Sequence, residues 1–149
     1  MFKRILVAAD GSEYSRQAFR TGLEVARRFD AEVQVLAVVE PSGLTGEVPL
    51  TTRDSHESYY SDKQGCKMLG QTMVGIDYAG VKLQTKIGRG RAADIILDEL
   101  RRDFDLVVMG SRGHSPLGGA LIGSVTQKVM GEAECPVLVA KKPWLQLPR

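Results

Sequence analysis

Residues 106–126 read LVVMGSRGHSPLGGALIGSVT, so that a short apolar run, a glycine-rich loop and a helical pattern follow one another. The run over 106–109 is continuous rather than alternating, which is typical of a strand covered on both faces in a parallel sheet. Ser124 can cap a helix that we expect over Ser124–Glu132, because a serine side chain accepts hydrogen bonds from the first N–H groups of a helix. The segment therefore predicts a strand, a long loop and a helix.

Four further runs predict the rest of the sheet. Continuous apolar residues cover 5–9, 33–39 and 136–140, and Gln34 is the only interruption among them. The fifth run, 81–87, alternates apolar with polar residues, and this alternation predicts a half-exposed strand at a sheet edge.

Helical patterns lie between the predicted strands. We expect helices, in addition to the last one, over Glu13–Phe29, 56–79 and 92–102, with Ser12 as the cap of the first. Three glycines, Gly65, Gly70 and Gly75, weaken the second pattern by about 1 kcal/mol each relative to alanine. Strands that alternate with helices predict an open parallel α/β sheet with helices on both faces, which is a Rossmann-like fold. The stretch 40–55 is the one long irregular segment.

Length and composition exclude several classes of protein. The 149 residues suit one domain over 1–149, and a net charge of +2 with scattered basic residues argues against a nucleic-acid partner. Cys66 and Cys135 have no CxxC spacing and no nearby histidine, which argues against a zinc site and a disulfide framework, and we expect Cys135 to be a small buried residue. Because no signal peptide and no membrane-spanning apolar run is present, we expect a cytoplasmic protein with no membrane partner.

The glycine-rich loop is the main candidate for a binding site. Ligands of open parallel sheets bind outside the carboxyl ends of the strands, where this loop begins. Glycines let successive backbone N–H groups approach an anion, the N-terminus of the next helix adds further donors, and Arg112 can offset phosphate charge. A glycine-rich surface loop with a capped helix is the alternative, and the residues alone leave both open.

Asp10 is the second candidate, because it ends the first predicted strand in Ala8-Ala9-Asp10-Gly11-Ser12. Its carboxylate can accept hydrogen bonds from an adenine amino group or a ribose hydroxyl, or it can face a metal-bound water. An Asx turn or a helix cap is the alternative for this Asp-Gly-Ser sequence. No residue is identified as catalytic, since His56 and His114 have no plausible partner in the sequence.

Three stretches resemble the universal stress protein family. The loop fits the pattern G-x2-G-x9-G followed by Ser or Thr, as Gly110-x2-Gly113-x9-Gly123-Ser124. The opening ILVAADGSE over 5–13 looks like the first strand and turn of the family, and CPVLV over 135–139 looks like its last strand. The resemblance covers the whole chain. It implies a five-stranded sheet in the order 3-2-1-4-5, usually a homodimer, and an ATP-binding type of member.

The resemblance also implies a nucleotide site. Adenine would contact Asp10 and the backbone of Val38, and the ribose would lie near Met109 and Gly110. The phosphates would be surrounded by Arg112, Gly113, Gly123, Ser124, Val125 and Thr126.

Three functions follow from the resemblance and the residues together. The first is an ATP-binding regulatory module of the stress response, acting as a nucleotide-dependent homodimer toward an unidentified protein partner. The second is a slow ATPase or nucleotidyl-transfer enzyme, and the third is a dimerisation module with a vestigial site. The nucleotide would be ATP, with ADP and AMP as alternatives, and Asp10 alone could help to hold a Mg²⁺ ion.

Overall fold

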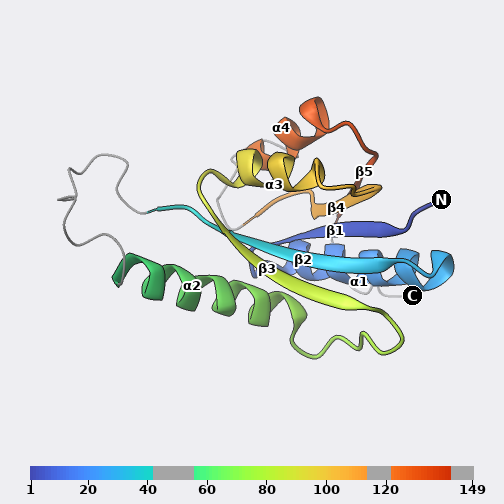
Figure 1. The fold of residues 1–149 in the computed structure, drawn as a ribbon, viewed down its shortest axis with the longest axis horizontal. Coiled ribbons are helices and arrows are strands. Elements are labelled where there is room, and N and C mark those ends of the chain that lie inside the picture. The colour runs from blue at the N-terminus through green and yellow to red at the C-terminus, as the bar shows by residue number, and fades with distance from the viewer. Residues whose placement is uncertain (42–55, 114–121, 142–149) are drawn as a thin grey trace, which may run out of the picture.

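Figure 1 shows the computed structural model of the chain, which describes residues 1–41, 56–113 and 122–141, with side chains from residue 62 onward in the second helix. Residues 42–55, 114–121 and 142–149 lie outside this description, and with them most of the irregular stretch, His114 and the chain end. The elements in chain order are β1 (Arg4–Ala9), α1 (Glu13–Phe29), β2 (Glu32–Val39), α2 (His56–Met73), β3 (Leu83–Arg89), α3 (Ala92–Leu100), β4 (Leu106–Gly110), α4 (Ser124–Glu132) and β5 (Val137–Ala140).

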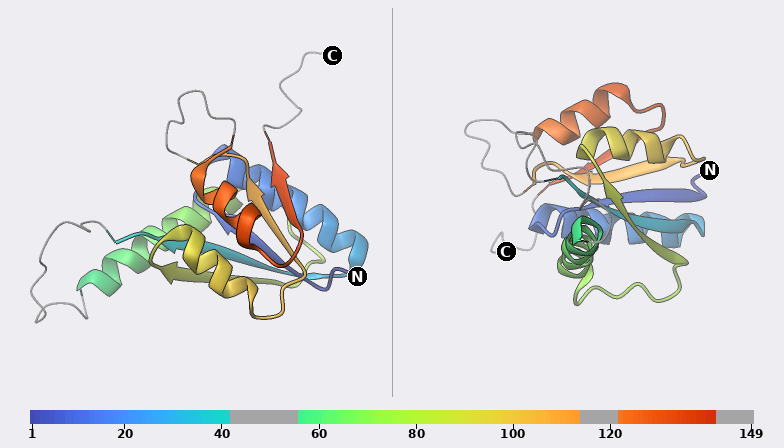
Figure 2. Two further views of the ribbon diagram at one scale, coloured as in Figure 1. Left: turned by 90° about the horizontal axis from the view of Figure 1, so that it is seen from above. Right: turned by 60° about the vertical axis from the view of Figure 1, so that its left-hand side comes forward.

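The sheet has the predicted architecture. Its five strands are parallel and lie in the order β3-β2-β1-β4-β5, which confirms the expected strand order and the edge position of β3. Helices α1 and α2 cover one face, and α3 and α4 cover the other (Figures 1 and 2). Because strand order reverses between β1 and β4, the crevice for a ligand is expected at the carboxyl ends of these two strands.

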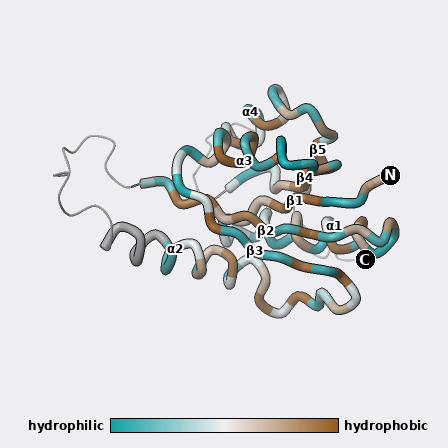
Figure 3. The backbone as a smooth tube through the Cα atoms, viewed as in Figure 1, coloured by the Kyte–Doolittle hydropathy of each residue, from teal (hydrophilic) through white to brown (hydrophobic). Residues whose placement is uncertain are grey.

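Successive residues along the strands belong alternately to two apolar cores, one on each face of the sheet. Ile5 and Val7 of β1 pack under α1 and α2, whereas Leu6 between them packs under α3 and α4. Figure 3 shows the brown apolar residues concentrated on the central strands. Both sides of these strands are buried, which is why the sequence runs are continuous.

The polar interruption at Gln34 has a partner on α3. Its Nε2 donates to Glu99 Oε1 at 2.9 Å, and Lys86 Nζ of β3 donates to Glu99 Oε2 at 2.8 Å. Burial acts to raise the pKa of Glu99, but the hydrogen bonds from Lys86 and Gln34 outweigh it and lower the pKa. The charged Glu99 thereby joins the edge of the sheet to α3.

Three sequence expectations need correction. Helix α2 ends at Met73 rather than 79, because Gly75 adopts a left-handed φ of 73° and closes the helix. The edge strand lies at Leu83–Arg89 instead of 81–87, since its register pairs Leu83 with Val33 and Arg89 with Val39. Cys135 is half-buried rather than buried, and this burial raises the pKa of its thiol. Within the described ranges, no helix is long and apolar enough to cross a membrane.

Candidate functional site

A cavity of about 680 Å³ lies at the carboxyl ends of β1, β2 and β4, where the strand order reverses. All ten residues that the resemblance placed in the nucleotide site line this one cavity: Asp10, Val38, Met109, Gly110, Arg112, Gly113, Gly123, Ser124, Val125 and Thr126. They come from four separate parts of the chain. The fold thus brings the expected set together around a single space.

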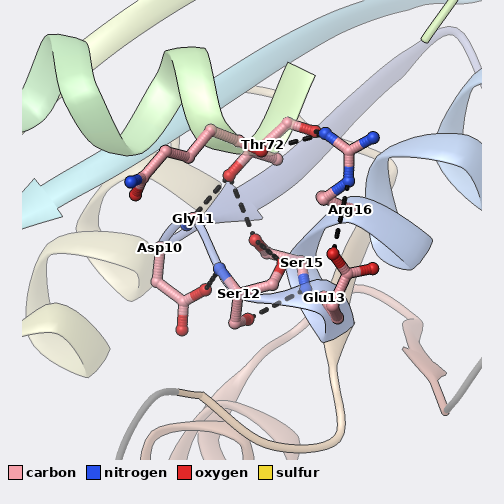
Figure 4. A network of polar contacts seen from close by, with 8 residues as sticks. Asp10, Gly11, Ser12, Glu13, Ser15, Arg16 and Thr72 are labelled. Carbon is pink, nitrogen blue, oxygen red and sulfur yellow. Dashed lines mark hydrogen bonds and ion pairs between the residues drawn. The ribbon is translucent and has the colours of Figure 1, made fainter. Parts of the chain in front are cut away.

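Asp10 occupies the turn that joins β1 to α1 (Figure 4). Its Oδ1 accepts a hydrogen bond of 2.8 Å from the Ser12 N–H, which forms the Asx turn that the sequence left as an alternative. Ser12 in turn caps α1, as predicted, because its Oγ accepts from the Ser15 N–H at 3.1 Å. The Asp10 carboxylate therefore has a local structural role and also forms part of the cavity wall.

A buried chain of hydroxyl groups connects the same turn to α2 (Figure 4). The Gly11 N–H donates to Thr72 Oγ1 at 2.9 Å, and Thr72 Oγ1 lies 3.0 Å from Ser15 Oγ. Ser15 Oγ donates its proton to the Ser12 carbonyl at 3.0 Å, so the proton between the two hydroxyls comes from Thr72. Thr72 is fully buried, and its hydroxyl anchors the end of α2 to the Asp10 turn.

Gly110 is the last residue of β4 and lies against the first turn of α1. A Cβ at this position would lie 2.6 Å from Tyr14 Cβ and 2.9 Å from the Tyr14 carbonyl carbon. On the opposite side, the buried Thr126 hydroxyl donates to the Gly110 carbonyl at 2.8 Å. The absence of a side chain at Gly110 is therefore required for close packing, and the Thr126 hydroxyl has a partner within the fold.

The start of α4 differs from the expectation that Ser124 caps it. Gly123 is the N-cap and Ser124 is the first helical residue, so the N-cap supplies no capping side chain. The Gly123 N–H donates to the Ser111 carbonyl at 2.7 Å, which fixes the end of the glycine-rich loop against β4. The N–H groups of the first turn of a helix have no acceptor within the helix, and in α4 they lie at this end of the cavity.

One wall of the cavity was not predicted from the sequence. It consists of residues of α2 at helical spacing, which are Gln64, Lys67, Met68 and Gln71. Across the cavity, Ala92 and Ile96 of α3 also line it. The apolar stripe of α2 identified its buried side, but nothing in the sequence showed that the neighbouring stripe faces the ends of the strands.

Charges of both signs line the cavity. Lys67 and Arg112 are cationic, while Asp10 and Glu40 are anionic. Glu40 Oε1 accepts a hydrogen bond of 3.1 Å from the Ala92 N–H, so it covers the start of α3. Among the residues that the structure describes, no group of three or more His, Cys, Asp or Glu side chains could hold a metal ion.

A second cavity, of about 470 Å³, lies where α3 ends and α4 leads into β5. Leu97, Phe104 and Cys135 are among its lining residues. None of the ten expected site residues reaches it, so it is separate from the cavity at the strand switch point.

The fold and the cavity together define an open α/β domain in which a glycine-rich segment borders the cavity at the strand switch point. The sequence profile of the Universal stress protein family matches residues 1–141, and the chain belongs to this family.

Individual relatives agree with this assignment. The chain is 35% identical over 146 residues to Universal stress protein MJ0531 of Methanocaldococcus jannaschii, across 96% of this chain and 84% of that protein. The universal stress protein UspA from Lactobacillus plantarum has a TM-score of 0.72 at 26% identity, over 93% of this chain and 97% of that one. A universal stress protein from Archaeoglobus fulgidus in complex with dAMP has a TM-score of 0.66 at 24% identity, over 94% and 98%.

Proposed function

We propose that the cavity binds an adenine nucleotide, with ATP as the expected ligand. The observation that carries the proposal is that all ten residues expected in a nucleotide site line one cavity at the strand switch point. The Archaeoglobus protein of the same fold, which is in complex with dAMP, supports an adenine nucleotide as the ligand class.

The phosphates would bind at the glycine-rich loop. Gly113 is exposed and carries no side chain, so its backbone can approach a ligand closely. The first turn of α4, whose N-cap is a glycine, offers N–H donors and the positive end of a helix dipole, and Arg112 lines the same cavity. A magnesium ion would be held mainly by the phosphates, as this ion commonly is.

The base would bind near the ends of β1 and β2, beside the glycine-rich loop. The register pairs Ala9 with Ala37, so Val38 extends one residue past the last paired residue of β1. Val38 and Asp10 both line the cavity beyond this point. In this proposal the protein is a cytoplasmic regulatory module of the stress response, and nucleotide occupancy changes its interaction with itself or with a protein partner.

Calorimetric titration of the protein with ATP, ADP, AMP and inorganic triphosphate tests the proposal. We expect ATP to bind more tightly than triphosphate, because only ATP presents a base. Asp10→Ala should weaken ATP binding by about 1–3 kcal/mol, since a buried hydrogen-bonding group of the base loses its partner. The matched control is Asp98→Ala on the exposed side of α3, which should bind ATP like the parent protein.

Equal affinities for ATP and triphosphate would contradict base recognition. Absence of ATP binding would contradict the proposal and favour a dimerisation module with a vestigial site. A phosphate-release assay on the same samples separates binding from turnover. Release above that of a Ser124→Ala variant would favour the slow ATPase.

We further propose that β5 forms a homodimer interface. Among the strands that the structure describes, β5 is an edge strand that pairs with β4 alone, and Leu138 is 36% exposed. An apolar edge strand is an aggregation hazard unless another strand pairs with it. A second copy of β5, antiparallel about a two-fold axis, would cover it and close the assembly.

The hydrogen-bond pattern shows which residues of β5 face the open edge. The Val107 N–H donates to the Pro136 carbonyl, and the Ser111 N–H donates to the Ala140 carbonyl. Residues with even numbers therefore face β4, and Val137 and Val139 direct their backbone groups outward, because these groups alternate along a strand. A proline at Leu138 would break the β4 ladder, whereas a proline at Val139 would remove an outward donor.

Light scattering at micromolar concentration tests the dimer. We expect the parent protein to be dimeric and Val139→Pro to be a folded monomer, because the variant loses an intermolecular hydrogen bond and keeps the ladder to β4. A folded parent protein that is monomeric at this concentration would refute the interface. A Val139→Pro variant that remains fully dimeric would show that β5 pairing does not hold the two copies together.

A further inference from the structure

The cavity of about 470 Å³ at the end of α3 combines an apolar lining with an acidic rim. Its apolar side chains are Leu97, Leu100, Phe104, Ala133 and Cys135. Its exposed carboxylates are Asp103, Glu132 and Glu134. Within the described ranges of the chain these carboxylates form no salt bridge, whereas Arg101 on the same rim pairs with Asp98 at 3.3 Å. The cavity therefore favours an occupant that is both apolar and cationic.

This cavity lies at the amino ends of β4 and β5. Phe104 precedes β4 by two residues, and Cys135 precedes β5 by two. Ala140, the last residue of β5, lies about 17 Å from Cys135, since each residue of a strand rises about 3.3 Å. Within one chain, residues 142–149 therefore follow the end of β5 that is remote from the cavity. A strand that runs antiparallel to β5 would instead lead directly to it.

The proposed β5 dimer brings such a strand to the open edge. Val137 and Val139 direct their backbone groups toward this edge. A two-fold pairing that uses both of them places Val137 opposite Val139 of the second copy. In the same register, Lys142 of the second copy comes opposite Glu134 on the rim of the cavity. The next residues of the second copy would thus arrive at the cavity.

We propose that residues 142–149 of each copy dock into this cavity of the other copy, with Trp144 as the anchor. The inference rests on the proposed β5 homodimer. The segment, which lies outside the described residues, reads KPWLQLPR. Its apolar side chains include Trp144, Leu145 and Leu147, and its cations are Lys142 and Arg149. These match the apolar lining and the acidic rim, and a tryptophan in an apolar pocket is a frequent anchor of protein interfaces.

The fluorescence of Trp144 tests the inference, because this residue is the only tryptophan of the chain. Indole emits at shorter wavelength in apolar surroundings than in water. We expect the parent dimer to emit at shorter wavelength than the Val139→Pro monomer and to be quenched less by acrylamide. Dilution of the parent protein through the dissociation constant of the dimer should produce the same shift to longer wavelength.

Glu134→Lys tests the charge complementarity. The new cation would face Lys142 of the second copy at both ends of the interface, so the dissociation constant of the dimer should rise by about fivefold or more. The double variant Glu134→Lys, Lys142→Glu restores the opposite charges and should return this constant to near the parent value. The matched control is Asp62→Lys, an exposed carboxylate of α2 outside the cavity, which should leave the constant and the Trp144 emission unchanged.

The outcomes separate this inference from the dimer itself. A monomeric parent protein overturns both. A dimer in which Trp144 emits as it does in the monomer, or in which Glu134→Lys leaves the dissociation constant unchanged, overturns the inference and leaves the β5 interface in place. Emission that stays at short wavelength in the Val139→Pro monomer would assign the segment to its own chain and would also overturn the inference.

Discussion

The Gly113→Val variant is expected to lose ATP affinity by at least about 100-fold while it keeps the parent fold. A Cβ at Gly113 would lie 2.7 Å from Asp10 Oδ2, so any side chain displaces the carboxylate that is proposed to contact the base. The isopropyl group would also fill the space through which phosphates approach the backbone. The fold should persist because Gly113 is exposed and its φ lies outside the left-handed region.

Gly131→Val is the control for this experiment. Gly131 lies in α4, away from the cavity, and a Cβ there has no atom within 4 Å. Both variants should give the parent's circular dichroism spectrum, and only Gly113→Val should fail in calorimetric titration with ATP. A well-folded Gly113→Val protein with the parent's ATP affinity would remove the glycine-rich loop from the binding site.

The second large effect is expected on stability. Gly110→Ala should destabilise the fold by about 1–3 kcal/mol, because its Cβ would overlap with Tyr14. One of the close atoms is the Tyr14 carbonyl carbon, which belongs to the backbone of α1 and cannot rotate away. Relief therefore requires that α1 move from β4, and the free energy of unfolding measured in urea should fall accordingly.

The same substitution at Gly70 is expected to raise the free energy of unfolding instead of lowering it. Gly70 lies within α2, and a Cβ there has no atom within 4 Å. Alanine should stabilise this position by up to about 1 kcal/mol through its higher helix propensity. If Gly110→Ala proved as stable as Gly70→Ala, the tight packing of β4 against α1 would be refuted.

The parts of the fold that were predictable from sequence depend on strong local signals. The central strands could be located because they are continuous apolar runs. Ile5 and Val7 belong to one core and Leu6 to the other, so both faces of the strand are apolar. The bounds of α1 agree with the expected Glu13–Phe29, since Ser12 is a recognisable cap, and in the structure Asp30 ends the helix in a left-handed conformation. The C-terminal end of α2 was not, because Gly65, Gly70 and Gly75 look equivalent in the sequence and only the last one terminates the helix.

The candidate site was predictable where motifs of the family mark its residues by position. The resemblance named residues in the turn after β1, in β2, in and after β4 and at the start of α4, and all of them line the cavity. Gln71 and Lys67 could not be found in this way, because their place depends on how α2 packs across the sheet. The capping role expected of Ser124 was wrong for a related reason: a serine and the glycine before it both suit a helix start, and backbone geometry selects Gly123.

Gly110 and Gly113 are the first two glycines of the same sequence motif, but a substitution at each would be selected against for a different reason. A substitution at Gly110 would be removed through loss of folded protein, whether or not the chain has a ligand. A substitution at Gly113 would leave the fold and be removed only while binding matters to the cell. If a protein of this fold no longer bound a ligand, Gly113 could be substituted without loss of folded protein, whereas Gly110 could not. Tolerance of a side chain at Gly110 thus reports on the packing of β4 against α1, whereas tolerance at Gly113 reports on whether the cavity binds a ligand.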